Sequence, residues 1–272
     1  MKRKGFKEIL LLFSMLFALT GCSVSEATQH GMAVDTIQTE DVLLRVDFLN
    51  VGQADCALLS TNGHYMVIDG GNNGDADTIL SYLEGQGVEK LDAVVGTHPH
   101  EDHIGSLDAI INHFDVDAVY MPKIMHTSKT FEDVLDAVAN KGLKIKSPSP
   151  GDTIDFNGLE IEVLGPQSEY KDFNNNSIVL KVNAGETAFL FTGDAEETAE
   201  KDILQADYDL QADVLKVGHH GSSTSSSQAF LQAVKPKYAV ISVGVGNSYH
   251  HPEEEALQRL QSIGAEIYRT DL

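Results

Sequence analysis

Residue types that bind metal ions are concentrated in one short segment, His98-Pro99-His100-Glu101-Asp102-His103. Three imidazoles and a carboxylate suit an apolar core poorly, but they bind first-row divalent metals through nitrogen and oxygen. His98 and His100 lie two residues apart, so on extended backbone their side chains face the same way and can hold one ion. A turn that begins a helix would then present Asp102 and His103 to a second ion. The spacing therefore predicts a metal site, against the alternative of an exposed polar loop.

Two further histidine pairs, His219-His220 and His250-His251, follow apolar stretches later in the chain. Strand ends that open into loops are where α/β folds place functional groups. Adjacent side chains on extended backbone point apart, so only one of His219 and His220 is expected to hold a given ion.

The elements that must position these groups alternate along most of the chain. Alternating apolar residues over 42–48 predict a first strand, and later apolar runs and helical stripes continue the pattern. The other predicted strands cover 57–59, 65–68, 91–95, 116–120, 153–156, 159–164, 178–182, 188–191, 213–217, 238–243 and 266–270. Helices are predicted around 79–83, 104–111, 131–138, 196–205, 226–234 and 253–263. This order favours an open α/β sandwich, with a single domain over 41–272.

The first 40 residues are predicted to lie outside that domain. A basic start precedes an apolar run over 9–19, which is shorter than the roughly 20 residues of a membrane span. The run ends in Leu19-Thr20-Gly21-Cys22, an order typical of a bacterial lipoprotein signal peptide over 1–21, with the lipid on Cys22. The alternative is an ordinary secretory signal. Residues 22–40 read as a polar tether, so we expect an exported protein, lipid-anchored on the outer face of the cell membrane or secreted.

Net charge bears on the partners of the chain. It holds 19 Lys and Arg against 41 Asp and Glu; residues 1–21 contain four basic and one acidic residue, which leaves 15 and 40 and a formal charge of −25. Nucleic-acid binders usually show a basic surface. Small basic clusters at 141–146 and 235–237 are candidate phosphate contacts or merely solubilising. Because no phosphate-binding loop or dinucleotide fingerprint occurs, no nucleotide cofactor is expected.

The histidine segment resembles the HxHxDH signature of the metallo-β-lactamase-fold hydrolases. Further segments resemble, in order over about 42–272, the external hydrolase domain of ComEC-type competence proteins. These segments are Asp47-Phe48-Leu49-Asn50-Val51-Gly52-Gln53-Ala54-Asp55, Ile68-Asp69-Gly70-Gly71, Asn174-Asn175-Asn176-Ser177, Thr192-Gly193-Asp194 and Lys216-Val217-Gly218-His219-His220-Gly221-Ser222. The resemblance implies a four-layer αββα sandwich, the metallo-β-lactamase fold, with the metal site at one edge between two sheets.

The resemblance also implies roles for individual residues. His98 and His100 would hold the first of two divalent ions, Asp102 and His103 the second, and Asp194 would bridge them. His220 would complete the second site, and His219 would be the alternative ligand or a contact to the charged oxygens of the substrate. His251 would donate a proton to the leaving group; the alternative is that it only opens the following helix. The predicted catalytic residues are thus Asp102, His219 and His251, with zinc as the expected metal and manganese as the alternative.

One departure from the superfamily pattern affects the first site. The superfamily usually has another histidine between the first motif and the bridging aspartate, whereas Asn174 to Asn176 stand in that place here. An amide oxygen is a weak zinc ligand, so the first site is expected to be loose or to favour a harder ion. Asn176 and Ser222 are predicted to contact substrate. Asp55 and Asp69 are predicted to orient ligand histidines, and a turn-forming role is the alternative for Asp69.

Two ions held close together favour hydrolysis by in-line displacement. We therefore expect phosphoester hydrolysis, with a phosphodiester as the substrate: DNA, as the resemblance implies, or a small or cell-wall diester such as a choline-phosphate group. An acyl hydrolase acting on a lactone or β-lactam is a further alternative, because this fold hosts both chemistries. A metal-bound surface module without turnover is the remaining one.

Overall fold

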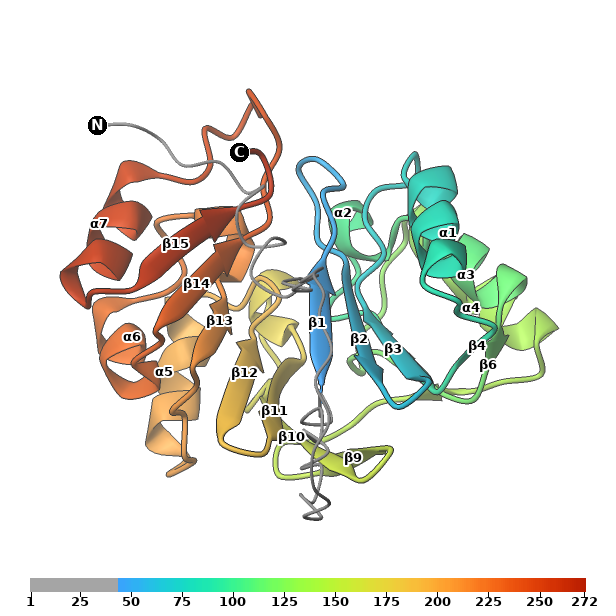
Figure 1. The fold of residues 1–272 in the computed structure, drawn as a ribbon, viewed down its shortest axis with the longest axis horizontal. Coiled ribbons are helices and arrows are strands. Elements are labelled where there is room, and N and C mark those ends of the chain that lie inside the picture. Colours follow the sequence, from blue (N-terminus) through green and yellow to red (C-terminus); the bar gives the residue numbers. More distant parts are fainter. Residues whose placement is uncertain (1–43) are drawn as a thin grey trace, which may run out of the picture. The chain divides into compact units, whose positions relative to one another are not determined.

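Two β-sheets packed face to face carry helices on their outer faces in the computed structural model, which describes residues 44–272 (Figure 1). The first sheet has the order β1 (Arg45–Phe48), β2 (Ala57–Thr61), β3 (His64–Ile68), β5 (Ala93–Val95), β7 (Val119–Tyr120) and β8 (Ile145–Lys146). The second has the order β15 (Glu266–Arg269), β14 (Tyr238–Ile241), β13 (Val214–Lys216), β12 (Thr187–Phe191), β11 (Val179–Ala184), β10 (Leu159–Gly165) and β9 (Thr153–Phe156). A small separate pair joins β4 (Lys90–Leu91) to β6 (Asp115–Val116).

Helices cover both sheets. The first sheet is covered by α1 (Ala76–Gly85), α2 (Glu101–Ile104), α3 (Leu107–His113) and α4 (Lys129–Asn140), which lie between its strands in sequence. The second is covered by α5 (Glu197–Gln205), α6 (Gln228–Val234) and α7 (Glu254–Ser262). Short 3₁₀ turns, η2 (Asn174–Asn176) and η3 (Gly218–Gly221), complete the described elements.

Three buried clusters separate the four layers. Adjacent residues of a strand face opposite sides of the sheet. On β2, Leu58 therefore packs with α1, α3 and α4 in one cluster, while Leu59 packs between the two sheets in another. The third cluster lies between the second sheet and α5 to α7, and includes Leu215 and Phe230. The predicted four-layer αββα sandwich is thereby confirmed.

Parallel pairing brings the chemically active loops to one edge of the molecule. β3, β5 and β7 pair in parallel, as do β12, β13, β14 and β15. The carboxyl ends of parallel strands share one edge of a sheet. The loops after β5, β12, β13 and β14, which hold the first histidine motif, Asp194, His219-His220 and His251, consequently converge there.

The structure divides three elements that the sequence predicts as continuous. The predicted strand 116–120 is divided into β6 and β7, which belong to different sheets. The predicted strand 91–95 is split at Asp92, whose carboxylate accepts a hydrogen bond from the Tyr65 backbone. The predicted helix 104–111 is split because the N–H groups of Gly105 and Ser106 bond to carbonyls of Gly71 and Gly70 instead of to their own helix. A Cβ at Gly105 would lie 2.2 Å from the backbone of residue 72, so only glycine permits this close approach.

The predicted signal peptide over 1–21, its Cys22 and the tether over 22–40 lie outside the described residues. Within 44–272, no helix is long and apolar enough to cross a membrane.

Candidate metal centre

The loop after β5 delivers the first two histidines. His98 is fully buried, and its Nε2 lies 3.0 Å from Nδ1 of His100. His100 has extended backbone and stands at the N-cap of α2. The two ring nitrogens face each other, as predicted from their spacing of two residues.

A second set of donors is more compact. Asp102, His103, Asp194 and His220 each offer one atom, and these atoms all lie within 4.8 Å of one another. They come from α2 and from the loops after β12 and β13. The set contains the four residues predicted for the second metal. His98 and His100 do not belong to it, so the first pair stands apart from the compact set.

Asp194 reaches both groups with different oxygens. Its Oδ2 lies 3.7 Å from Nε2 of His98, whereas its Oδ1 lies 3.2 Å from Nε2 of His103 and 3.9 Å from Nε2 of His220. The carboxylate is 1% exposed. This position is the one that a bridging ligand requires.

The donor atoms of the compact set fit a divalent cation. His103 Nε2, His220 Nε2 and Asp194 Oδ1 are buried and have no hydrogen-bond partner within the described chain. Leaving buried polar atoms unpaired costs about 1–3 kcal/mol each, so three together in one spot indicate a missing partner. Imidazole nitrogen and carboxylate oxygen are ligands that zinc and manganese accept.

Asp69 and Thr97 fix the orientation of His103. Asp69 Oδ2 lies 2.9 Å from Nδ1 of His103, and its other oxygen accepts bonds from the backbone and hydroxyl of Thr97. A carboxylate on Nδ1 leaves Nε2 free to bind a metal. Asp69 therefore stands where the sequence predicted an orienting residue, although it also begins the turn before Gly70.

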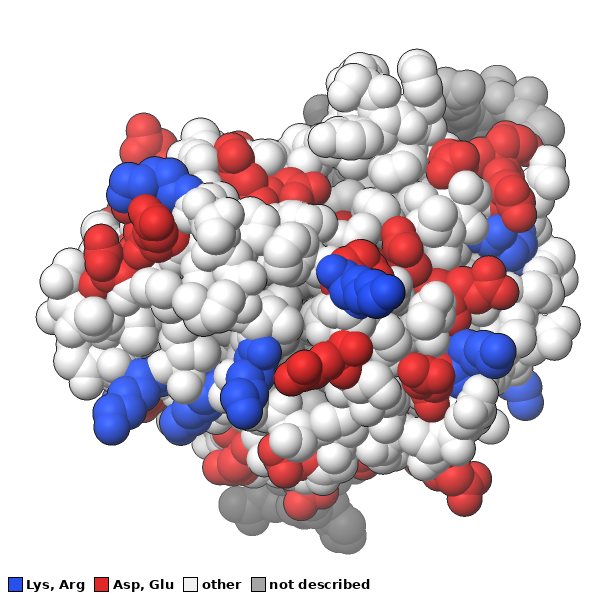
Figure 2. Space-filling view, turned by 180° about the vertical axis from the view of Figure 1, so that it is seen from behind, with Lys and Arg blue, Asp and Glu red and all other residues white. Residues whose placement is uncertain are grey.

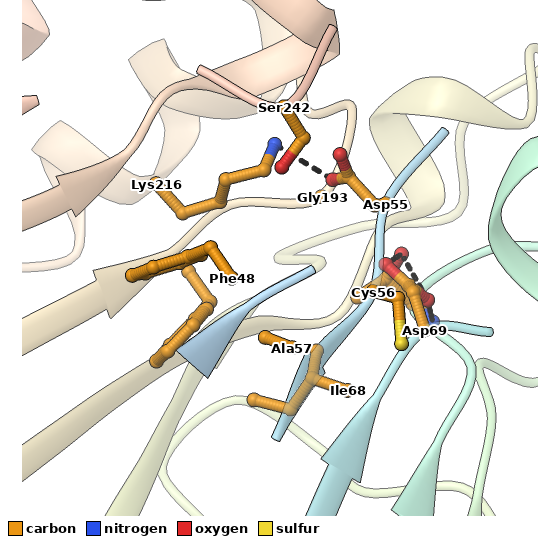
Figure 3. A pocket seen from close by; sticks show the side chains of 11 residues that line it. Phe48, Asp55, Cys56, Ala57, Ile68, Asp69, Gly193, Lys216 and Ser242 are labelled. Atoms are coloured by element: carbon orange, nitrogen blue, oxygen red, sulfur yellow. Dashed lines mark hydrogen bonds and ion pairs between the residues drawn. The ribbon is translucent and has the colours of Figure 1, made fainter. Parts of the chain in front are cut away.

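Asp55 and Lys216 form a buried ion pair behind the metal centre. Lys216 Nζ lies 2.7 Å from Asp55 Oδ2, and their side chains are only 5% and 6% exposed. Figure 3 shows the ends of the two side chains pointing toward each other at a small pocket that both line. Asp55 Oδ1 is 3.3 Å from Nδ1 of His220, and the Asp55 N–H donates to the Asp102 carbonyl. The pair thus supports two residues of the compact set, and Lys216 was not predicted to do so.

His219 and His220 do not lie on extended backbone, so that expectation from the sequence was wrong. Both adopt left-handed conformations, with φ of 49° and 52°. Their rings still diverge: His220 enters the compact set, while His219 Nε2 lies 3.7 Å from Asp194 Oδ2, the oxygen that also faces His98. His219 is therefore near the first pair rather than an alternative to His220.

The left-handed backbone at His219 predicts a difference between two substitutions. A non-glycine residue in this conformation costs about 1–2 kcal/mol relative to glycine. We expect the free energy of unfolding of His219→Gly to exceed that of His219→Ala by about 1–2 kcal/mol, so that His219→Gly unfolds at a higher denaturant concentration. Urea unfolding of the metal-free variants measures it. Equal stability of the two would contradict a left-handed backbone at this residue.

An open cleft of about 350 Å³ lies over the metal centre. Gln53, Tyr249 and His251 line it together with metal-centre residues. The His251 ring packs edge-on to His219, with centroids 5.5 Å apart, and burial together with the nearby His219 lowers its pKa. His251 therefore faces the cleft, as its predicted role requires.

Two predicted substrate contacts do not face the cleft. The Asn176 amide is 2% exposed, and it donates to the carbonyls of Tyr170 and Asp172 and accepts from the Tyr170 N–H. The two N–H groups and the oxygen of the Asn176 amide are therefore bonded within the loop at 170–172. Ser222 turns toward Thr224 and Glu253. The prediction for both residues is corrected: they hold loops in place.

Asn174 is the residue of the predicted Asn174–Asn176 segment that reaches the cleft, and His126 lies near His100. Asn174 lines the cleft, and its buried Oδ1 has no partner within residues 44–272, whereas its Nδ2 donates to Glu196. His126 was not among the predicted site residues, but its ring lies 6.3 Å from that of His100 and 4.6 Å from that of Phe173. Only the folded loop after β7 brings it there, so no sequence spacing could have found it.

Carboxylates around the centre hold protons on two of its histidines. Burial alone would lower the pKa of His220, but Asp194 and Asp55 outweigh it and raise the pKa to about 10. Burial likewise opposes protonation of His103, yet Asp194 and Asp69 raise its pKa well above the usual value. Both imidazoles are therefore protonated at pH 7 in the metal-free protein.

Metal binding at pH 7 is accordingly expected to release protons. Ligation needs neutral imidazoles, so His103 and His220 must lose about two protons in total, and affinity must rise as pH increases. Calorimetric titration with Zn²⁺ or Mn²⁺ in buffers of different ionisation enthalpy counts the released protons. Binding without proton release would contradict the protonation of these two imidazoles in the metal-free protein.

Comparison with known proteins places this geometry in a family. The model of the metallo-beta-lactamase superfamily matches residues 49–245. The chain belongs to this superfamily. It is a member of a largely hydrolytic superfamily, and its described residues form a plausible dinuclear metal site.

Related sequences include competence proteins. ComE operon protein 3 of Bacillus subtilis (strain 168) is 32% identical over 245 residues, which cover 83% of this chain and 32% of that protein. Competence protein ComA of Neisseria gonorrhoeae is 33% identical over 227 residues, covering 82% of this chain and 30% of that protein. Recombination protein 2 of Haemophilus influenzae is 28% identical over 232 residues, covering 83% and 27%. The chain thus spans about a third of the length of these relatives.

Solved structures share the fold. The metallo-beta-lactamase fold protein YhfI from Bacillus subtilis superposes with a TM-score of 0.58 at 12% identity, covering 83% of this chain and 95% of that one. Zn²⁺-bound PqqB from Methylobacterium extorquens gives a TM-score of 0.53 at 12% identity, covering 81% and 86%. At such identities the likeness concerns the fold alone.

Proposed function

We propose that this protein hydrolyses phosphodiesters at the cleft with two divalent metal ions. The observation that carries the proposal is the position of Asp194, whose two oxygens face the His98 side and the compact set separately. His98, His100 and Asp194 would hold one ion, and Asp102, His103, Asp194 and His220 the other. When bound, such ions polarise phosphoryl oxygens and activate water for in-line attack.

The charge of the centre favours an anionic substrate. At and behind the metal positions, two dications would face the carboxylates of Asp55, Asp69, Asp102 and Asp194 beside the lysine Lys216, a formal charge of +1; Glu101 at the cleft and Glu196 beside His219 add negative charge farther out. A phosphodiester carries one negative charge and would neutralise this excess. The positive charge of the buried Lys216 therefore favours binding of an anionic substrate at the centre.

Three side chains around the centre are placed to handle the substrate. The exposed edge of His219 near Asp194 can donate a hydrogen bond to a phosphoryl oxygen. The unpartnered Oδ1 of Asn174 can accept from substrate or complete the loose first site. Because the pKa of His251 is lowered, its imidazole is mostly neutral at pH 7 in the free protein, which favours hydrogen bonding to the leaving group over outright protonation.

Relatives named for competence and recombination support DNA as the diester. The formal charge of −25 beyond residue 21 opposes a long polyanion. Figure 2 shows Lys and Arg scattered among Asp and Glu, without a continuous basic surface on that face. Short strands or small diesters, including choline-phosphate groups of a cell wall, are therefore the substrates that the charge favours.

Acyl transfer is the second candidate function. Hydroxyacylglutathione hydrolase of Aeromonas salmonicida is 27% identical over 198 residues, covering 70% of this chain and 69% of that protein. A hydrolase of that name breaks an acyl bond rather than a phosphoester. A thioester, lactone or β-lactam substrate must therefore be compared directly with a phosphodiester.

A substrate panel separates these candidates. The protein, freed of metal and then supplied with Zn²⁺ or Mn²⁺, would be given bis(p-nitrophenyl) phosphate, single- and double-stranded DNA, p-nitrophenylphosphocholine, a glutathione thioester and a chromogenic β-lactam. Metal-dependent cleavage of any diester above the acyl substrates supports the proposal. Turnover of acyl substrates alone would overturn it, and no turnover of any substrate would favour a metal-bound module without activity.

We also propose that the protein is exported and anchored by a lipid on Cys22. The support is the order of basic start, apolar run and Leu19-Thr20-Gly21-Cys22 in the sequence. Growth with radiolabelled palmitate should label the wild-type protein and leave Cys22→Ser unlabelled. Equal labelling of the two, or none of either, would contradict the anchor.

A further inference from the structure

An exposed aromatic side chain, Tyr249, lines the cleft, and other exposed apolar side chains lie on the loops that carry site residues. Within residues 44–272, five large hydrophobic side chains are strongly exposed, and two of them, Val245 and Tyr249, lie on the loop after β14. A third, Met125, precedes His126, whose ring neighbours that of His100. Exposed apolar groups beside a site mark a surface for a ligand, because water otherwise covers them at a cost.

Tyr249 offers a flat surface within this group. Its ring is 67% exposed and lines the cleft. One face stacks on the His251 ring, with centroids 5.7 Å apart and planes inclined by 26°. A ring that already stacks on one side and is exposed overall can accept a second planar group.

The loop that carries Tyr249 is held in place although it is exposed. The Asn247 side chain donates to the carbonyls of Gly244 and His251 and accepts from the His251 N–H. The Gly244 N–H donates to the side-chain oxygen of Gln53. A Cβ at Gly244 would lie only 2.6 Å from the backbone nitrogen of Gln53. The platform is thus ordered before any ligand arrives, which lowers the cost of binding.

We propose that Tyr249, backed by His251, is a stacking platform for a nucleobase next to the scissile phosphate, and that it selects unpaired nucleotides. The inference rests on the proposed phosphodiesterase function and adds the residue that determines its specificity. A base in a duplex has no free face, so stacking requires a single strand or a strand end. Base stacking is sequence-tolerant because every base has a π-face, and this contribution to binding does not come from surface charge.

The test compares two diesters that differ only in their bases. One is the dinucleotide of thymidine, and the other carries abasic tetrahydrofuran sugars around the same phosphodiester. Rates would be measured for wild type, Tyr249→Phe and Tyr249→Ala, with Tyr238→Ala as an exposed tyrosine control on β14. Tyr249→Ala should lose about 5- to 150-fold in kcat/KM on thymidine dinucleotide, from base stacking worth about 1–3 kcal/mol.

The other measurements should discriminate between roles. Tyr238→Ala should behave as wild type, and Tyr249→Phe should keep most of the wild-type rate because it keeps the ring. Tyr249→Ala should lose several-fold less on the abasic diester than on the thymidine dinucleotide, because only the loss of His251 packing acts there. Equal losses by Tyr249→Ala on both diesters, or no loss on either, would overturn the platform. A Tyr249-dependent preference for p-nitrophenylphosphocholine over both diesters would overturn it in favour of a cationic headgroup.

A binding assay separates this inference from the proposed function. Metal-free protein should quench the fluorescence of a 2-aminopurine dinucleotide, and Tyr249→Ala should not. If wild type with metal cleaves neither diester, the proposed function fails. Quenching that depends on Tyr249 would then still support the stacking platform. If the quenching is also absent, both the platform and the proposed function are contradicted.

Discussion

Replacing Asp194 with Asn is expected to lower phosphodiester hydrolysis by about 10³-fold or more. The carboxylate faces both donor groups, so replacing it with an amide would weaken the binding of both metal ions at once. Metal ions contribute several kcal/mol of charge stabilisation, and each 1.36 kcal/mol is tenfold in rate. Steady-state rates with saturating Mn²⁺ or Zn²⁺ measure the loss.

The matched control is Asp77→Asn, an exposed aspartate in the first turn of α1. It makes the same chemical change outside the cleft and should leave the rate unchanged. Metal content, measured by mass spectrometry after dialysis, should fall in Asp194→Asn alone. A variant that keeps both its metal and its rate would contradict a bridging role for Asp194.

Replacing Lys216 with Met is expected to destabilise the metal-free protein by about 3–5 kcal/mol. The change removes the lysine from the buried Asp55 carboxylate and leaves His220, 3.3 Å away, as its remaining cationic neighbour. Removing both charges in Lys216→Met with Asp55→Leu should restore part of the stability, because no unpaired charge then remains. Urea unfolding of the wild type, both single variants and the double variant gives the coupling energy.

Lys237 provides a matched control on the surface. It pairs with Asp213 at 2.7 Å, the same distance as Lys216 to Asp55, but its side chain is 73% exposed. Lys237→Met should therefore cost little or no stability, because an ion pair in contact with solvent contributes little. Equal losses for the two lysines would show that burial does not govern the Lys216 pair.

Much of the site could be predicted because the ligands lie in short local patterns. The segment from His98 to His103 sets much of its own geometry: His100 has extended backbone and a helical turn follows it. Asp194 and His220 follow strands that the apolar pattern locates, and parallel pairing brings their loops to one edge. The fold class follows from the same alternation and from the resemblance to a known family.

The rest depends on tertiary contacts that no local pattern encodes. The backbone of His219 and His220 is left-handed, and a histidine residue type does not predict that conformation. Asn176 and Ser222 have polar side chains like those of substrate contacts, yet neighbouring loops use up their bonding capacity. Lys216 has the residue type of a surface cation, and only the packed structure shows it buried against Asp55.

The most direct test of metal-dependent phosphodiester hydrolysis at this cleft is the rate on bis(p-nitrophenyl) phosphate as metal is returned to chelator-treated protein. We expect no hydrolysis without metal, a rate that appears as Mn²⁺ or Zn²⁺ is added, and no such recovery in Asp194→Asn. Hydrolysis that persists without metal, or that Asp194→Asn recovers in full, would contradict a two-metal reaction at this cleft.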